Sequence, residues 1–172
     1  MPSGKPPLRA VLGTIVFVLT VPASAIGLVP FLISRWTRAA PFFGWPLWRW
    51  IGAGLFVAAA PVFLNFLSRF VGEGHGTPAP IAPTRYLVVG GAFRYVRNPG
   101  YVAVISMVIG QALWFGNTGV LVYAALLALG FHVFVVLYEE PTLRRQFGAE
   151  YESYCREIPR WLPRLKPAAG RR

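Results

Sequence analysis

Long stretches without charged side chains constrain this chain more than any other feature. Residues 10–34 (AVLGTIVFVLTVPASAIGLVPFLIS) and 118–138 (TGVLVYAALLALGFHVFVVLY) contain no Asp, Glu, Lys or Arg. A helix of about 20 apolar residues crosses the hydrocarbon core of a bilayer. Residues 47–68 and 101–116 are also strongly apolar, the latter short for a full crossing. The sequence therefore predicts an all-α polytopic bundle of about four transmembrane helices, forming a single integral-membrane domain over residues 1–172.

The first apolar stretch has a second interpretation. Two basic residues precede it, and the small residues 23–25 (Ala-Ser-Ala) resemble a signal-peptide cleavage site. Apolarity continues well past these small residues, which favours a membrane span. Pro22 and Pro30 are expected to kink the segment, so residues 10–34 form either one span or a kinked hairpin.

Composition and charge exclude several classes of protein. Hydrophobic residues make up 55% of the chain and charged residues only 13%, against about 25% charged in a typical soluble domain. The net charge is nevertheless +11, which indicates cationic loops on a membrane protein rather than a disordered polybasic chain or a soluble nucleic-acid binder. A single cysteine, Cys155, excludes an intrachain disulfide and a cysteine-based zinc site. The two histidines lie far apart, so no metal site is expected.

The basic residues are unevenly distributed. With four spans, the N-terminus, the 69–100 connection and the tail after Glu140 share one side, which carries 14 of the 17 Lys and Arg residues. The positive-inside rule makes that side cytoplasmic, so both termini are expected in the cytoplasm, at a bacterial inner membrane. The 35–49 connection, with three arginines, argues against this topology. Five tryptophans fall near the opposite interface, as in an aromatic belt: Trp36, Trp45, Trp48, Trp50 and Trp114.

Two segments outside the spans differ in character. Residues 73–85 are rich in Gly and Pro and predict an extended loop. Residues 142–158 predict an amphipathic helix in the cytoplasmic tail, because apolar residues recur there at helical spacing. These residues are Leu143, Phe147, Tyr151, Tyr154 and Ile158.

Charged residues that could do chemistry gather at the cytoplasmic face. Glu139 and Glu140 end the last span, where two carboxylates are costly unless they reach water, cations or donors. They could simply form ion pairs with Arg144 or Arg145, or they could grip a cationic ligand. The segment 94–101 (RYVRNPGY) leads into the third span and contains a turn and two arginines. These arginines are either lipid anchors or anion contacts. Together the two clusters could bind a zwitterion, with Arg on its carboxylate and Glu on its ammonium group.

His132 lies seven residues before Glu139, so two helical turns place both on one face. Bonding to a neighbouring helix and a role in the site are both consistent with this position. Cys155 lies within the predicted tail helix and is interpreted as a packing residue.

Residues 74–101 and 138–163 resemble the integral-membrane methyltransferase superfamily, which includes isoprenylcysteine carboxyl methyltransferases and phospholipid N-methyltransferases. The shared pattern is Arg-His-Pro-x-Tyr, a span pair, Glu-Glu, then Phe-Gly-x-x-Tyr-x-x-Tyr and a terminal Pro-Arg…Pro. It covers roughly residues 72–165. This chain departs from it at Asn98, where the usual residue is His, so an acid–base role at that position is in doubt.

The resemblance implies S-adenosylmethionine as cofactor and a membrane lipid or lipidated acceptor, with no nucleic-acid partner. The implied cofactor site lies in the 72–100 loop and at the start of the 139–165 tail. Its residues would be Gly74, Gly76, Arg97, Asn98, Pro99, Tyr101, Glu139 and Glu140. The tail would close over the site with the implied substrate residues Arg144, Tyr151, Tyr154 and Arg160. His132 and Arg160 are the candidate catalytic residues.

Alternatives remain open. The acceptor could be an isoprenylcysteine-like carboxylate or a phospholipid amine, and an amine needs a base to remove its proton. Membrane sterol reductases, which use NADPH, have a similar turn and tail. The Glu pair argues against them because it would repel a nucleotide phosphate. A non-catalytic membrane protein of the same fold is a third interpretation. The oligomeric state stays open.

Overall fold

The computed structural model describes residue 16 and residues 20–72 and 86–168. All regular secondary structure in these residues is helical, as predicted. Two π-helical turns and two 3₁₀ turns connect or extend the α-helices. In chain order the elements are the π turn Ser24–Leu28, α2 (Val29–Ser34), the 3₁₀ turn Phe42–Gly44, α3 (Leu47–Gly72), the 3₁₀ turn Gly91–Arg94, α4 (Pro99–Phe115), α5 (Thr118–Phe134), the π turn Val135–Glu139, α6 (Glu140–Phe147) and α7 (Ala149–Glu157).

Two helices are long and apolar enough to cross a membrane, Leu47–Arg69 and the continuous helix Thr118–Phe147. Thr20–Ser34 and Pro99–Phe115 are shorter apolar helices. The predicted stretches at 47–68, 101–116 and 118–138 thus form helices at the expected places. Most of residues 10–19 lie outside the described residues, and a total of four spans stays a prediction.

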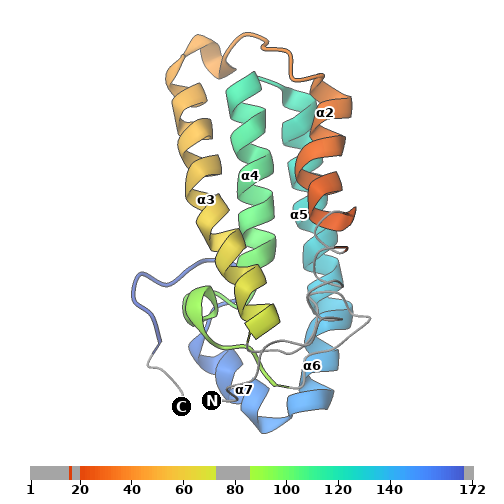
Figure 1. Cartoon of the computed structure of the whole chain (residues 1–172), viewed down its shortest axis with the longest axis vertical. Helices are drawn as coiled ribbons and strands as arrows, with labels where there is room; N and C mark the ends of the chain where they lie inside the picture. Colours follow the sequence, from red (N-terminus) through yellow and green to blue (C-terminus); the bar gives the residue numbers. More distant parts are fainter. Residues whose placement is uncertain (1–15, 17–19, 73–85, 169–172) are drawn as a thin grey trace.

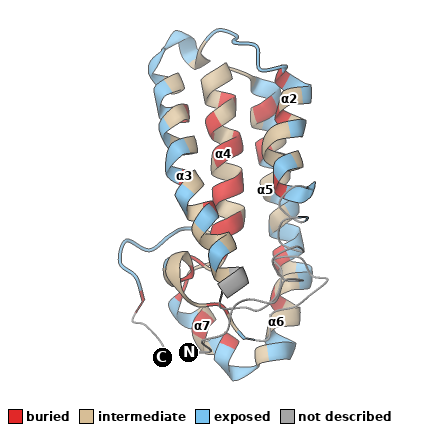
Figure 2. Ribbon diagram, in the orientation of Figure 1, coloured by how far each residue is buried: buried red, intermediate tan, exposed pale blue. Residues whose placement is uncertain are grey.

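Helix α4 occupies the centre of the bundle. It runs between α3 and α5, with α2 alongside α5 (Figure 1). Figure 2 shows more buried residues on α4 than on α3 or α5, which expose their outer faces. Val108 and Ala112 of α4 are fully buried, while Val57 of α3 and Leu126 of α5 are exposed. Exposed aliphatic residues on the outer faces suit contact with lipid chains.

Two glycines allow α3 and α4 to pack closely. A Cβ atom added at Gly52 would lie 2.5 Å from the Gly110 carbonyl oxygen, and one at Gly110 would lie 2.7 Å from the Gly52 carbonyl oxygen. Small residues at helix crossings let backbones approach within a membrane, where lipid is as apolar as the helix surface. The α3–α4 crossing therefore depends on both positions lacking a side chain.

The two π turns have the same local cause. Each ends two residues before a proline, Pro30 or Pro141, which has no N–H for the helical ladder. In the first turn the Val29 N–H bonds to the Ser24 carbonyl, five residues back. Proline-freed carbonyls in a membrane helix need donors from neighbouring helices. Side chains of α4 and α5 supply them.

Gln111 Nε2 of α4 donates to the Ile26 carbonyl at 2.7 Å. Tyr123 Oη of α5 donates to the Ala25 carbonyl at 3.2 Å. These bonds attach the Thr20–Ser34 helix to the bundle through its proline-distorted turn.

The tail differs from the predicted single helix over 142–158. It forms two helices, α6 and α7, separated at Gly148. Gly148 has φ 50° and ψ −125°, a conformation essentially restricted to glycine. The predicted apolar face is nevertheless buried. Tyr151, Tyr154 and Ile158 pack together with Leu87 and Val89, which lie in the segment before α4.

The glycine crossing yields a matched test within one helix. We expect Gly52→Ala to lower the thermal stability of the detergent-purified protein, by about 1–3 kcal/mol as for other overpacked sites. Gly54→Ala is the control, because no atom lies within 4 Å of a Cβ built there. It should be neutral or slightly stabilising. Equal melting temperatures for the two variants would contradict the close crossing.

Candidate functional site

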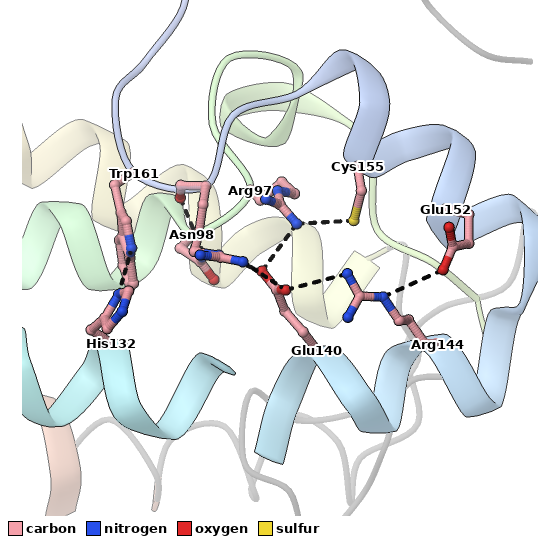
Figure 3. Close-up of polar contacts among 9 residues, drawn as sticks. Arg97, Asn98, His132, Glu140, Arg144, Glu152, Cys155 and Trp161 are labelled. Carbon is pink, nitrogen blue, oxygen red and sulfur yellow. Dashed lines mark hydrogen bonds and ion pairs between the residues drawn. The ribbon is translucent and has the colours of Figure 1, made fainter. Parts of the chain in front are cut away.

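Three separate segments meet at the end of the bundle near α6 and α7. They are the residues before and at the start of α4, the turn between α5 and α6, and the segment after α7 (Figure 3). The helices fix this meeting point because Pro99 begins α4 and Glu140 begins α6. Residues distant in sequence, including Arg97 and Glu140, are thereby brought into direct contact.

Glu140 is the buried centre of the site. Its side chain is only 4% exposed, and Arg97 Nη1 donates to its Oε1 at 3.0 Å. Arg160 binds the same carboxylate with two nitrogens, Nε to Oε1 at 2.6 Å and Nη2 to Oε2 at 3.0 Å. Arg144 Nη2 lies farther away, 3.7 Å from Oε2. Bidentate guanidinium–carboxylate pairs are among the strongest hydrogen-bonded contacts in proteins.

The contacts with Glu140 also favour the charged form of Arg160. The hydrogen bonds to Glu140 raise the pKa of the Arg160 guanidinium above its usual value. Arg160 therefore remains protonated at all physiological pH values. The paired charges hold the segment after α7 against the start of α6.

Glu139 has a different partner. Tyr101 Oη, from the first turns of α4, donates to Glu139 Oε2 at 2.8 Å. The Tyr101 ring also packs against Phe131 of α5, with ring centroids 4.6 Å apart. The two adjacent carboxylates therefore serve separate contacts, one toward α4 and one toward the tail.

The segment after α7 forms a strap across the site, defined here as residues 158–161. The Arg97 N–H donates to the Pro159 carbonyl at 2.9 Å. Asn98 Nδ2 donates to the Arg160 carbonyl at 3.1 Å. Asn98, which replaces the usual histidine, is 7% exposed and thus acts here as a hydrogen-bond donor to the strap.

Backbone pairing continues beyond the strap. The Arg164 N–H donates to the Tyr95 carbonyl, and the Ala168 N–H donates to the Arg94 carbonyl, both at 3.0 Å. The Arg94 guanidinium returns to the Ala168 carbonyl at 2.9 Å through Nε. The last described residues are thus fastened to the segment that precedes α4.

His132 contacts the strap rather than Glu139. Trp161 Nε1 donates to His132 Nδ1 at 3.1 Å (Figure 3). The π turn Val135–Glu139 lies between His132 and Glu139 and alters the regular helical register on which their common face was predicted.

The remaining predicted residues divide into three groups. Tyr151 and Tyr154 are buried, and burial raises the pKa of both hydroxyls; Tyr154 donates to the Phe93 carbonyl at 2.8 Å. Arg144 is half exposed and pairs with Glu152 at 3.4 Å. Gly74 and Gly76 lie outside the described residues.

Sequence reasoning missed two participants. Cys155 packs against the cluster of Tyr151, Tyr154 and Ile158, as predicted, but its Sγ also lies 2.9 Å from Arg97 Nη1, a contact that the sequence does not predict. Trp161 was not singled out. The only local signal was its position in the segment PRWLP, where flanking prolines favour an extended chain that cannot join α7.

The described residues contain no group of three His, Cys, Asp or Glu side chains arranged to hold a metal ion. The cluster around Glu140 is instead rich in guanidinium donors. Among the described residues of this cluster, one guanidinium nitrogen, Arg97 Nε, is buried without a hydrogen-bond acceptor.

Comparisons with known proteins agree with the resemblance noted in the sequence. Residues 76–150 match the family model described as phospholipid methyltransferase. Over 77 residues the chain is 32% identical to proteins of Oryza sativa subsp. indica and subsp. japonica, each named probable protein-S-isoprenylcysteine O-methyltransferase. The alignment covers 45% of this chain and 40% of each rice protein. No solved structure matches. The predicted resemblance to the integral-membrane methyltransferase superfamily is therefore confirmed over residues 76–150, which include Arg97, Tyr101 and the Glu139–Glu140 pair; the strap lies after the matched residues.

The burial of Glu140 yields a prediction about stability. Glu140→Ala leaves Arg97 and Arg160 without their carboxylate, so we expect a loss of about 3 kcal/mol, as for other broken buried pairs. Glu152→Ala removes the 3.4 Å partner of Arg144, a pair with both side chains about half exposed. It should cost less than about 1 kcal/mol. Thermal unfolding in detergent measures the difference, and equal losses would show that Glu140 is not a structural centre.

Proposed function

We propose that this protein is an S-adenosylmethionine-dependent methyltransferase that acts at the cytoplasmic membrane face on a lipid or lipidated acceptor. The observation that carries the proposal is the convergence of the two matched motifs. The Arg97-to-Tyr101 segment and the Glu139–Glu140 pair are 38 or more residues apart, yet they bond through Tyr101–Glu139 and Arg97–Glu140. A chain that needed only packing would not require an ion pair and a carboxylate hydrogen bond at this place.

The residues present fit the amino-acid end of this cofactor. S-adenosylmethionine carries a carboxylate and an ammonium group there, and supplies a methyl group attached to a positively charged sulfur. The buried Arg97 Nε lacks an acceptor among the described residues and would bind the carboxylate. Glu139 contacts only a neutral tyrosine hydroxyl in the hydrogen bond described above, so its charge is available for the ammonium group.

Glu140 receives a different role in this proposal. Its two oxygens already accept bonds from Arg97 and Arg160. It therefore positions both guanidiniums rather than binding the cofactor itself. Through Arg160 it also fixes the strap, which would help to exclude water from the methyl group. Orientation and exclusion of water can supply most of the catalysis for a direct displacement.

The surroundings favour a carboxylate acceptor over an amine. An amine must lose a proton, and each candidate base has another partner in this proposal: Glu140 binds arginines, Glu139 would bind the cofactor ammonium group, and His132 accepts from Trp161. A carboxylate needs no base, and guanidiniums such as Arg144 would attract it. We infer that the acceptor is a carboxylate on a lipidated molecule.

The cofactor assignment is tested by ligand binding. We expect S-adenosylhomocysteine to raise the melting temperature of the purified protein, and NADPH to leave it unchanged. Glu139→Gln keeps an acceptor for Tyr101 but removes the charge, and should weaken S-adenosylhomocysteine binding at least about tenfold, the value of one charged hydrogen bond.

Glu150→Gln is the matched control, since it removes one carboxylate from an exposed position on α7. It should bind S-adenosylhomocysteine like the wild type. Stabilisation by NADPH alone would replace the proposal with a reductase, and unchanged binding by Glu139→Gln would overturn the role given to that residue.

The acceptor is tested by transfer of a radiolabelled methyl group in nanodiscs. We expect label on an S-farnesylated cysteine with a free carboxylate, and none on its amide. Label on phosphatidylethanolamine instead would refute the carboxylate inference while leaving the cofactor assignment intact.

A further inference from the structure

A second cluster of arginines lies at the opposite end of the bundle. It belongs to the connection between α2 and α3 and to the first turn of α3, and it meets the end of α4 (Figure 1). Helix α4 has 17 residues, so its two ends are about 25 Å apart at 1.5 Å per residue. The cluster thus lies close to the far membrane interface when the candidate site lies at the near one.

Contacts at this end draw two arginines together. Arg38 stacks over the Trp114 ring, with Cζ 4.7 Å from the ring centroid. Arg49 Nη2 donates to the carbonyl of Ala39, the residue after Arg38, at 2.7 Å. The Ala39 N–H in turn donates to the Phe115 carbonyl at 2.9 Å. The loop, α3 and the end of α4 therefore hold both guanidiniums in one small region.

The cluster lacks negative partners within the described residues. All five described carboxylate side chains belong to the other end, at Glu139 and Glu140 or on α7. Arg38 and Arg49 form no ion pair there. Arg49 Nε is moreover buried with no acceptor in the described structure. A buried guanidinium N–H without an acceptor costs free energy, so this atom points to an oxygen-bearing anion that completes the site.

The surroundings identify the source of that anion. Trp36, Trp45 and Trp50 are exposed at this end, and Trp50 packs edge-on against Trp114 with ring centroids 6.0 Å apart. Exposed tryptophans are enriched at the headgroup level of a bilayer. An anion that reaches Arg38 and Arg49 there is most readily a lipid phosphate. Two guanidiniums without a carboxylate favour a headgroup with net negative charge over a choline headgroup.

We propose that Arg38 and Arg49, with the indole of Trp114, bind the phosphate of an anionic phospholipid at the interface opposite the candidate methyltransferase site. This assignment accounts for arginines in a connection where the positive-inside rule does not expect them. It does not depend on the proposed function, because neither arginine contacts Glu140 or its partners.

Native mass spectrometry of the detergent-purified protein tests the proposal. Phosphatidylglycerol and phosphatidylcholine with identical acyl chains are the probes. We expect the wild type to retain one phosphatidylglycerol in preference to phosphatidylcholine. The double variant Arg38→Gln/Arg49→Gln should bind it about thirtyfold more weakly, since each arginine near an anionic lipid surface is worth roughly one kcal/mol.

Arg145→Gln/Arg156→Gln is the matched control, because it removes the same charge from exposed positions on α6 and α7. It should retain phosphatidylglycerol like the wild type. Equal retention by both double variants would overturn the proposal. Displacement of the lipid by excess inorganic phosphate would also overturn it, by showing a site for a free anion. If the double variant does not fold, Arg38→Gln alone decides, because that change removes one of the two guanidiniums and leaves the hydrogen bond of Arg49 to Ala39 in place.

Discussion

The burial of one carboxylate is the constraint on which this site depends. A charge at the end of a membrane helix is costly unless cations and donors surround it. Glu140 meets this requirement with Arg97 from before α4 and Arg160 from after α7. Because Arg97 and Arg160 bind the same carboxylate from different parts of the chain, the three segments are held together as one unit. This pairing sets the position of the strap together with the hydrogen bonds of Arg97 to Pro159 and of Asn98 to Arg160. From that position Trp161 contacts His132.

Much of the helical architecture was predictable because each membrane helix is encoded locally. Uninterrupted apolar stretches located α3, α4 and α5, and Pro99 marked the start of α4 as expected of a proline at a helix N-terminus. The division of the tail at Gly148 was not predicted. Apolar spacing there was consistent with one continuous helix, and a glycine inside a helical pattern signals a break only when its backbone conformation is known.

The site was predictable in part for a similar reason. Adjacent carboxylates and a nearby arginine stood out because they are rare in an apolar chain, and the structure brings Arg97 and Glu140 together. The distribution of their contacts could not be read from spacing. Proline at position 141 produces the π turn that alters the register between His132 and Glu139, and strap residues pair through backbone carbonyls that leave no pattern in the side chains. Asn98 illustrates this limit, since its role as a donor to Arg160 depends on where a distant carbonyl lies.

The fastening of residues 158–168 to residues 94–97 has a consequence for biosynthesis. The ribosome synthesises every apolar helix of the described chain before Arg160, and chains acquire structure from the N-terminus onward during synthesis. Glu140 therefore reaches the membrane surface before Arg160, its bidentate partner, has been synthesised. Until then Arg97 is the nearest available counter-charge, and the helical bundle can assemble before the strap crosses the site. The strap can consequently join the site after the bundle has assembled, and a chain that ended after α7 would lack the contacts of Arg160 with Glu140.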